Sequence, residues 1–250
     1  MKQVDITQAD FLLDVFDRFG KSDAQAALDF VRKNSSQEKK DELQPVYNLE
    51  ESEVQAVDLG LPSGTLWADR NVGAKSPEDY GGYFSWGNTE PHFPNRENMD
   101  WGDDEEAFDY SFSSSNYEET EGYKLEGDID LAHDAAHVNM GEPWQMPKSE
   151  QFQELYDYCT WTRKTVNGVN GYLVTSKENG NSIFFPCSGD GDGTSWDYRG
   201  SNGGYWSSSL YSATRGRGLG FDSGGVAPQG GSHRFNGFAV RAVQTSFNNK

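Results

Sequence analysis

Four residue types are missing from the segment between Ser207 and Val243. Lys, Glu, Met and Trp together account for 40 of the 250 residues of the chain, yet none of them occurs in this segment. Regularly spaced apolar residues alternate there with Gly, Ser, Ala, Thr, Arg, Asp, His and Phe. A codon that ends in C and has its first two bases randomised encodes all of these types, but never the four missing ones or Gln. The bias indicates either a diversified segment, broken only by Gln229, or an ordinary glycine-rich surface loop.

Cysteine is scarce as well. The chain has two cysteines, Cys159 and Cys187, which allow at most one disulfide and stand in no CxxC spacing. The sequence therefore excludes a disulfide scaffold and a cysteine-rich metal site. We expect both residues to be buried small apolar side chains.

Other patterns that carry chemistry are weak. His133 and His137 are four residues apart and could present two imidazoles on one helical face, but no third ligand cluster accompanies them. The run 189–193, GDGDG, favours a turn over a calcium loop. Ser207–Ser209 lack the context of a catalytic serine and are expected at the edge of a strand. No glycine motif for binding dinucleotides or phosphates is present. The sequence thus predicts no metal, no cofactor and no enzymatic activity.

Basic residues and long apolar runs are also few. The net charge of −19 argues against a nucleic-acid partner, because binding to phosphates relies on Lys and Arg. No apolar stretch reaches the length of a membrane span, and the N-terminus lacks the pattern of a secretory signal. We therefore expect synthesis in the cytoplasm and no membrane insertion.

The first part of the chain has a different pattern from the rest. Residues 1–45 are predicted to form a helical hairpin whose apolar face is too large to remain uncovered, which indicates docking or assembly through this segment. A linker, 46–56, precedes a main domain at 57–244, and a tail occupies 245–250. Within the main domain, 97–134 is expected to be an acidic, solvated surface insertion.

The main domain combines short strands with one clear helix. Apolar residues recur at Phe152, Leu155, Tyr156 and Cys159, which predicts a helix that starts near Ser149 with this stripe in the core. Strands are predicted at 172–176 and 182–186, joined by an Asn-Gly turn at 179–180. A last strand, 237–243, would place Phe238, Val240 and Ala242 on one face. The pattern favours an α+β domain with long structured loops.

The segment 207–243 has the composition of a recognition surface. Leu219, Phe221, Val226 and Phe238 form a regular apolar frame. Aromatic and arginine residues among Gly and Ser resemble the anchors of binding surfaces. The residues expected to project in this way are Tyr211, Arg215, Arg217, His233, Arg234 and Phe235.

An ordered series of motifs carries a family resemblance over roughly residues 54–244. These motifs are VDLGLPSGTLWADRNVG, GGYFSWG, GEPWQMPKSEQF, VNGYLV, NSIFFP, GGYWSSS and NGFAVRAV. They resemble bacterial and prophage proteins with a C-type lectin fold of the formylglycine-generating-enzyme type. Within that group, the ending resembles the variable region of proteins diversified by diversity-generating retroelements.

The resemblance implies a set of diversified, ligand-binding residues, because miscopied template adenines turn codons of AAC type into the observed residue types. We refer to these residues as the predicted variable positions. Asn236 is included as a position left unmutated. Gln229 is not included, because mutation of an AAC-type codon at its adenines cannot produce Gln. The predicted variable positions are Leu210, Ser212, Ala213, Thr214, Arg215, Gly216, Arg217, Gly218, Gly220, Asp222, Gly224, Gly225, Ala227, Gly230, Gly231, Ser232, His233, Phe235 and Asn236.

The resemblance also implies a function. The expected protein is a receptor-binding component of a phage tail or cell surface, with a protein or cell-surface ligand and with residues 1–45 as the attachment to an assembly. Calcium-dependent sugar binding is not expected, because Glu142-Pro143 lacks its partner residue. Two alternatives stay open: an undiversified surface adhesin or structural subunit, and a cysteine-modifying enzyme of the same fold that uses Cys159 and Cys187.

Overall fold

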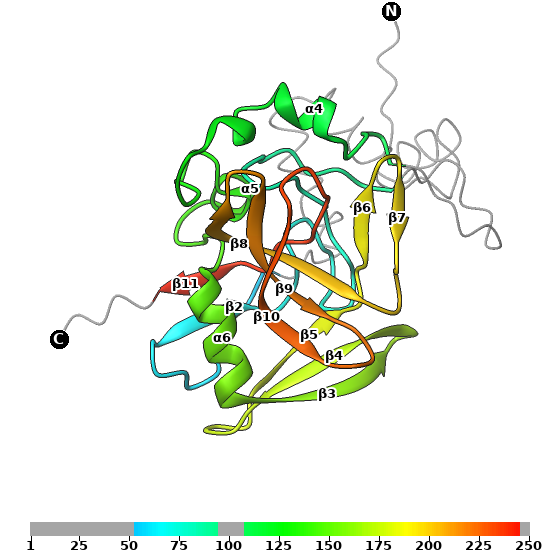
Figure 1. Cartoon of the computed structure of the whole chain (residues 1–250). Helices are drawn as coiled ribbons and strands as arrows, with labels where there is room; N and C mark the ends of the chain where they lie inside the picture. Colours follow the sequence, from blue (N-terminus) through cyan, green and yellow to red (C-terminus); the bar gives the residue numbers. More distant parts are fainter. Residues whose placement is uncertain (1–52, 95–107, 246–250) are drawn as a thin grey trace, which may run out of the picture. The chain divides into compact units, whose positions relative to one another are not determined.

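The computed structural model describes residues 53–94 and 108–245. The predicted helical hairpin 1–45, most of the linker and the part of the acidic insertion at 97–107 lie outside these residues. The described chain is mostly antiparallel β-sheet with a few short helices (Figure 1). None of the helices in this part is long and apolar enough to cross a membrane.

Three of the four small sheets have three strands and one is a two-stranded hairpin, in the orders β1-β2-β11, β3-β4-β5, β10-β9-β8 and β6-β7. The helices are α4 (Ser114–Glu118), the 3-10 helix η2 (Gly122–Lys124), α5 (Ala135–Met140) and α6 (Ser149–Tyr158). The strands are β1 (Ala56–Asp58), β2 (Thr65–Ala68), β3 (Cys159–Val166), β4 (Val169–Ser176), β5 (Ser182–Pro186), β6 (Asp190–Asp192), β7 (Ser195–Asp197), β8 (Gly203–Ser212), β9 (Arg215–Phe221), β10 (Val226–His233) and β11 (Val243–Thr245).

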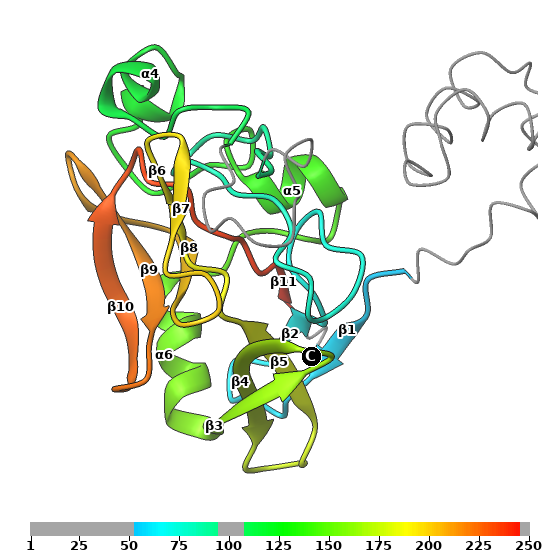
Figure 2. The ribbon, with the colours of Figure 1, turned by 90° about the vertical axis from the view of Figure 1, so that its right-hand side faces the viewer.

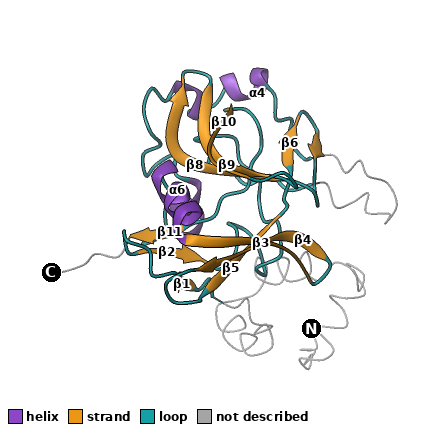
Figure 3. Ribbon diagram, turned by 60° about the horizontal axis from the view of Figure 1, so that its bottom comes forward, coloured by secondary structure: helices purple, strands orange, loops and turns teal. Residues whose placement is uncertain are grey.

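Helix α6 forms where the apolar spacing predicts it. The side chains of Phe152 and Leu155 and the following Cys159 are buried, and the helix lies against both β3 and the sheet β8–β10 (Figure 3). Tyr156, predicted to share this stripe, is instead 44% exposed. A helix on the rim of a domain buries a narrow stripe, and the i+4 position of this stripe faces solvent.

The predicted hairpin 172–186 is confirmed as β4 and β5, which are paired from Gly171↔Pro186 to Thr175↔Ser182. Strand β3 was not predicted, because most of its side chains are polar and exposed. It forms as an edge strand because its full length pairs with β4 and its Trp161 ring packs near Tyr172 and Phe185.

The predicted last strand, 237–243, is not a continuous ladder. Residues 237–239 form only isolated bridges, and a regular strand begins at Val243. The expected alternation holds nevertheless: Val240 and Ala242 belong to one core cluster, while Ala239 belongs to another. Both faces of the segment are buried. Its residues 237–239 each pair with a different neighbouring segment, so they form no continuous ladder.

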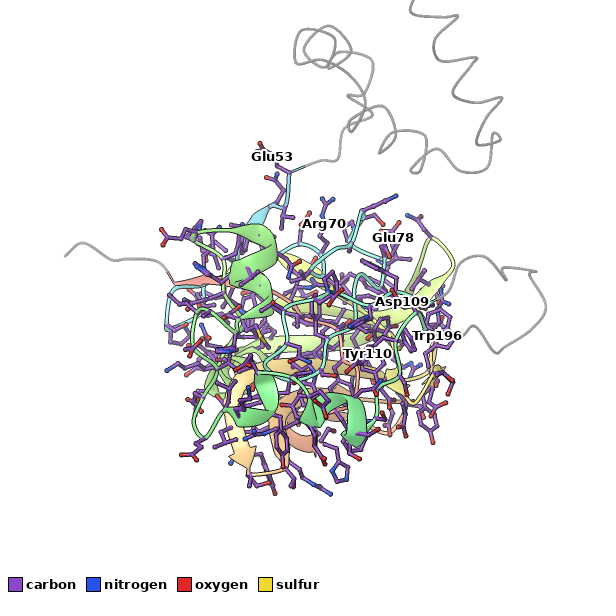
Figure 4. All side chains as sticks on the ribbon, turned by 90° about the horizontal axis from the view of Figure 1, so that it is seen from above. Glu53, Arg70, Glu78, Asp109, Tyr110 and Trp196 are labelled. Carbon is purple, nitrogen blue, oxygen red and sulfur yellow. The ribbon has the colours of Figure 1, made fainter. Side chains whose placement is uncertain are left out.

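The core is rich in aromatic residues and is divided into clusters. One contains Trp67, Phe185 and Tyr205 beneath α6, and a second contains Trp86 and Trp206. A third lies at the sheet β6-β7 and consists of Tyr83, Phe108 and Phe112 with Tyr80, Tyr110 and Trp196 at its margin; Tyr110 and Trp196 are labelled in Figure 4.

A fully buried cation joins the C-terminal segment to the core. The Arg241 guanidinium donates hydrogen bonds to Asn71 Oδ1 at 2.8 Å, to the Ala68 carbonyl at 3.1 Å and to the Phe184 carbonyl at 2.8 Å. It lies 4.6 Å from the centre of the Phe185 ring. Burial lowers the pKa of Arg241 to about 10, because the charged form loses its hydration. The planar fork of an arginine is needed to reach all three oxygens.

We expect Arg241→Lys to lower the free energy of unfolding by about 3 kcal/mol or more, because an ammonium cannot reach all three acceptors and leaves buried carbonyls unpaired. Urea denaturation followed by circular dichroism measures the loss. The matched variant Arg163→Lys changes an exposed arginine and is expected to stay within about 0.5 kcal/mol. Equal stability of the two variants would contradict the role assigned to Arg241.

Candidate ligand-recognition surface

The segment 207–243 folds mainly into the sheet β8–β10, which lies along one side of the molecule (Figure 2). Strand β9 is central, paired with β8 through Tyr205↔Leu219 and with β10 through Val226↔Phe221. Register shifts interrupt both ladders and give the sheet its local bends. We call this sheet together with the following turn, 234–236, the recognition surface.

The structure brings the predicted variable positions together on this surface. Seventeen of the 19 are exposed or half-exposed, and the two buried ones are Gly216 and Gly218. The predicted frame lies beneath them: Leu219 and Phe221 are buried in the core cluster under α6, and Val226 packs against it. The alternation of apolar and small residues therefore separates an inner from an outer side, as the sequence predicts.

Gly216 and Gly218 are the two buried glycines among the predicted variable positions. A Cβ at Gly216 would lie 2.4 Å from the Trp86 ring, and one at Gly218 would lie 2.5 Å from the Tyr205 carbonyl oxygen. A Cβ at Gly220 would meet nothing within 4 Å. Packing therefore restricts Gly216 and Gly218 among the predicted variable positions, because a side chain at either one requires neighbouring core atoms to move.

A groove of about 450 Å³ opens on the recognition surface, which is within the size range of ligand sites in proteins. Its walls combine frame residues such as Phe238 with Asp190 from β6. Seven predicted variable positions line it: Gly218, Gly220, Asp222, Gly225, Ala227, Gly230 and Ser232. Because most of these residues lack bulky side chains, the groove is wide in this chain.

A smaller hollow of about 170 Å³ lies at the other end of the recognition surface. Tyr117 and Tyr123 line it from the acidic insertion, and His233 and Phe235 line it from the segment 207–243. The His233 and Phe235 rings stack with centres 5.1 Å apart. The hollow is therefore mainly aromatic, in contrast to the glycine-rich groove.

The described part of the insertion is anchored rather than merely solvated. Phe112 and Tyr117 are buried, and the Tyr117 hydroxyl donates a 2.6 Å hydrogen bond to the Trp86 carbonyl. The Asp128 carboxylate accepts a hydrogen bond from the Leu210 amide at 2.8 Å. Besides its acidic surface, the insertion therefore has aromatic residues that fix it to the core and a carboxylate that holds β8, and counting charges does not reveal either.

Arg234 does not project as predicted. It is buried, its guanidinium donates to the Leu125 and Ser212 carbonyls, and it lies 4.6 Å from the centre of the Trp86 ring. This residue supports the surface from below because its side chain joins the insertion to β8. Arg234 lies in a turn, where the alternation of inward and outward side chains seen in a strand does not apply, so the sequence pattern could not reveal this role.

The remaining predicted anchors lie at the surface. Tyr211 and Arg215 are exposed, and Arg217 is half-exposed with its guanidinium 4.9 Å from the centre of the Tyr211 ring. Gln229, the exception in the residue-type pattern, lies in the irregular part of β10 and donates a hydrogen bond to the Ser149 carbonyl at 3.3 Å. Through this hydrogen bond Gln229 holds β10 to α6, which is a structural role.

Asp190 is the ionisable residue of the groove that the sequence did not single out. Burial and the neighbouring carboxylates of Asp197 and Asp192 raise its pKa to about 6. The turn predicted at 189–193 is wrong for most of this run: Asp190–Asp192 form strand β6, and the chain turns only at 193–194, before β7. The hairpin β6–β7 places Asp190 on the groove. Only the pairing of distant segments makes this residue part of the site.

The cysteines and histidines form no reactive or metal-binding group in the part of the chain described. Burial raises the pKa of Cys159 to about 11 and also raises that of Cys187, which is the opposite of thiol activation. His133 precedes α5 instead of sharing a helical face with His137, and its Nδ1 lies 2.7 Å from Asp130 Oδ1. No group of three metal-ligating side chains occurs among the described residues.

Ser207–Ser209 lie in β8, an outer strand of its sheet, and all three are buried. The Ser207 hydroxyl donates to the Arg217 carbonyl at 2.9 Å, and the Ser209 hydroxyl accepts from the Ser149 amide at 3.0 Å. These serines therefore hold β8 to β9 and to α6.

Comparison with known proteins gave no match: no family model and no curated protein matches the sequence, and no solved structure matches the fold.

We expect Gly216→Ala to destabilise the protein by about 1–3 kcal/mol, because the new methyl group must displace the Trp86 ring in a packed core. Gly220→Ala on the same strand has open space and is expected to change stability by less than about 0.5 kcal/mol. Thermal unfolding of both variants measures the difference. A tolerated Gly216→Ala would show that this position is as free as Gly220.

We expect Asp190→Asn to gain stability relative to the natural chain as the pH rises from about 4 to above 6. The folded state holds the Asp190 proton up to a higher pH than the unfolded state, so the natural chain loses stability across this window. After solvent screening is allowed for, the gain is about 1 kcal/mol. Urea titrations at pH 4 and pH 7.5 measure it, with the exposed Glu118→Gln as the control, and an unchanged difference between the two pH values would refute it.

Proposed function

We propose that this chain is a ligand-binding protein whose recognition surface is diversified by a retroelement and displayed on a scaffold of the C-type lectin type. The observation that carries the proposal is the placement of the predicted variable positions. Residues chosen by their type in the sequence lie together on one sheet and its loops, and 17 of 19 reach the surface. Seven of the 19 line a groove large enough for a ligand.

The frame beneath these positions suits repeated change. The Trp86 indole donates to the Ser207 carbonyl at 2.9 Å, and the Trp206 indole donates to the Phe84 carbonyl at 2.7 Å. The first bond holds β8 through its backbone and the second through the Trp206 side chain, which is not one of the predicted variable positions. Substitution of an outward-facing residue therefore leaves the attachment of the sheet intact, which is what a surface with many alternative sequences requires.

The proposed ligand is a protein or cell-surface molecule, and the proposed setting is a phage tail or cell-surface assembly joined through residues 1–45. A surface composed largely of Gly and Ser supplies few anchors, so each site binds weakly. Display of several copies would raise the overall affinity by a factor of about 10² to 10⁴ where the geometry allows simultaneous contact.

Sequencing of the gene and its flanks in many isolates tests the proposal. We expect a nearby near-repeat and substitutions that arise at template adenines, confined to the predicted variable positions, with Leu219, Phe221 and Gln229 constant. Packing further predicts that Gly216 and Gly218 stay glycine or change only to the smallest residues. An invariant 3′ end without a near-repeat would reject diversification and favour an undiversified adhesin.

A further inference from the structure

The groove contains one carboxylate that does not belong to the variable segment. Asp190 lies on β6, outside residues 207–243, yet it lines the groove beside Gly220 and Gly230. Its neighbour Gly191 faces the opposite way, because a Cβ there would lie 2.7 Å from the Phe112 ring in the core. Successive side chains of a strand point to opposite faces, so the Asp190 carboxylate faces the groove.

The charge of Asp190 has no partner among the described residues. No hydrogen bond from that part of the chain reaches its carboxylate, and no lysine or arginine is among the residues that line the groove. Asp222, the other carboxylate of the groove, already accepts hydrogen bonds from the amides of Gly224 and Gly225 at 2.6 and 3.1 Å. Both of these bonds end on Asp222 Oδ1. Asp190 is therefore the carboxylate of the groove that has both oxygens available to a ligand.

The raised pKa of Asp190 agrees with this geometry, since nearby carboxylates and lost hydration oppose its charge. A cation that entered the groove would reverse both effects. The charge of the whole chain, −19, would also attract a basic partner over longer distances.

We propose that the groove binds a lysine or arginine side chain of a protein ligand, with Asp190 as the constant anchor. The inference deepens the proposed function and rests on it. Residues 220, 227 and 230 line the same groove, so their side chains set which surroundings of the basic residue are accepted. A constant charge then fixes one end of every ligand, while the variable positions select the rest.

Nuclear magnetic resonance titration of the full, ¹⁵N-labelled chain tests this assignment. The probe is N-acetyl-arginine methylamide, and N-acetyl-citrulline methylamide serves as its uncharged counterpart. We expect the arginine probe to give saturable shifts of the Gly204, Gly220 and Gly230 amide signals, and the citrulline probe to give none. Asp190→Asn is expected to weaken binding about tenfold, because it removes a hydrogen bond between charged groups.

Asp192→Asn is the matched control, because Asp192 lies on the same strand and carries the same charge but does not line the groove. It is expected to bind like the natural chain. The proposal is overturned if the groove glycines do not respond, if citrulline binds equally well, or if both variants lose affinity alike. The comparison of the two probes on the natural chain decides the matter even where Asp190→Asn does not fold.

The two proposals fail separately. Absence of arginine binding, together with substitutions confined to the predicted variable positions in isolates, would remove the cationic ligand and keep the diversified surface. Arginine binding in a chain whose gene shows no variation would leave a cation-binding groove on an undiversified protein.

Discussion

A buried guanidinium fixes the position of the C-terminal segment, and the recognition surface depends on that segment. Arg241 has three neutral oxygen partners from β2, the following loop and β5, so all three elements must be in place to stabilise its charge. The segment held in this way continues back to Ala239, whose carbonyl accepts the Trp206 amide at 3.0 Å. Strand β8 is thereby attached to the core through backbone bonds, and β9 and β10 follow from it.

This arrangement separates stability from recognition. The inner side of the sheet carries large residues such as Leu219 and Phe221, whereas its outer side carries glycines and small polar residues. Arg234 and the aromatic residues of the insertion lie beneath the end of the recognition surface that carries the smaller hollow, and they support it through hydrogen bonds. The proposed ligand surface, which has few anchors, therefore rests on a core that supplies rigidity, and Asp190 lies on the groove without belonging to the segment 207–243.

Much of the fold followed from local patterns, and the failures have common causes. Helix α6 and the hairpin of β4 and β5 were predictable because their periodicity and turn residues are local signals. Strand β3 and the anchoring of the insertion were not, because polar edge strands and loops depend on partners distant in sequence. Tyr156 and Arg234 were assigned to the wrong environment for the same reason: residue type indicates a preference for burial, but the neighbours decide it.

The sequence by itself determined where the predicted variable positions lie along the chain, which apolar residues form the frame beneath them and which residue types the segment contains. Those features depend on alternation and composition, and both can be counted in one segment. Only the tertiary structure decided which glycines are free and which are forced, because Gly216 is restricted by Trp86, which lies far from it in the chain. The position of Asp190 on the groove was also decided only by the tertiary structure. It depends on the pairing of β6 with β7 and on the packing of that hairpin, and the residues of the segment 207–243 do not reveal either.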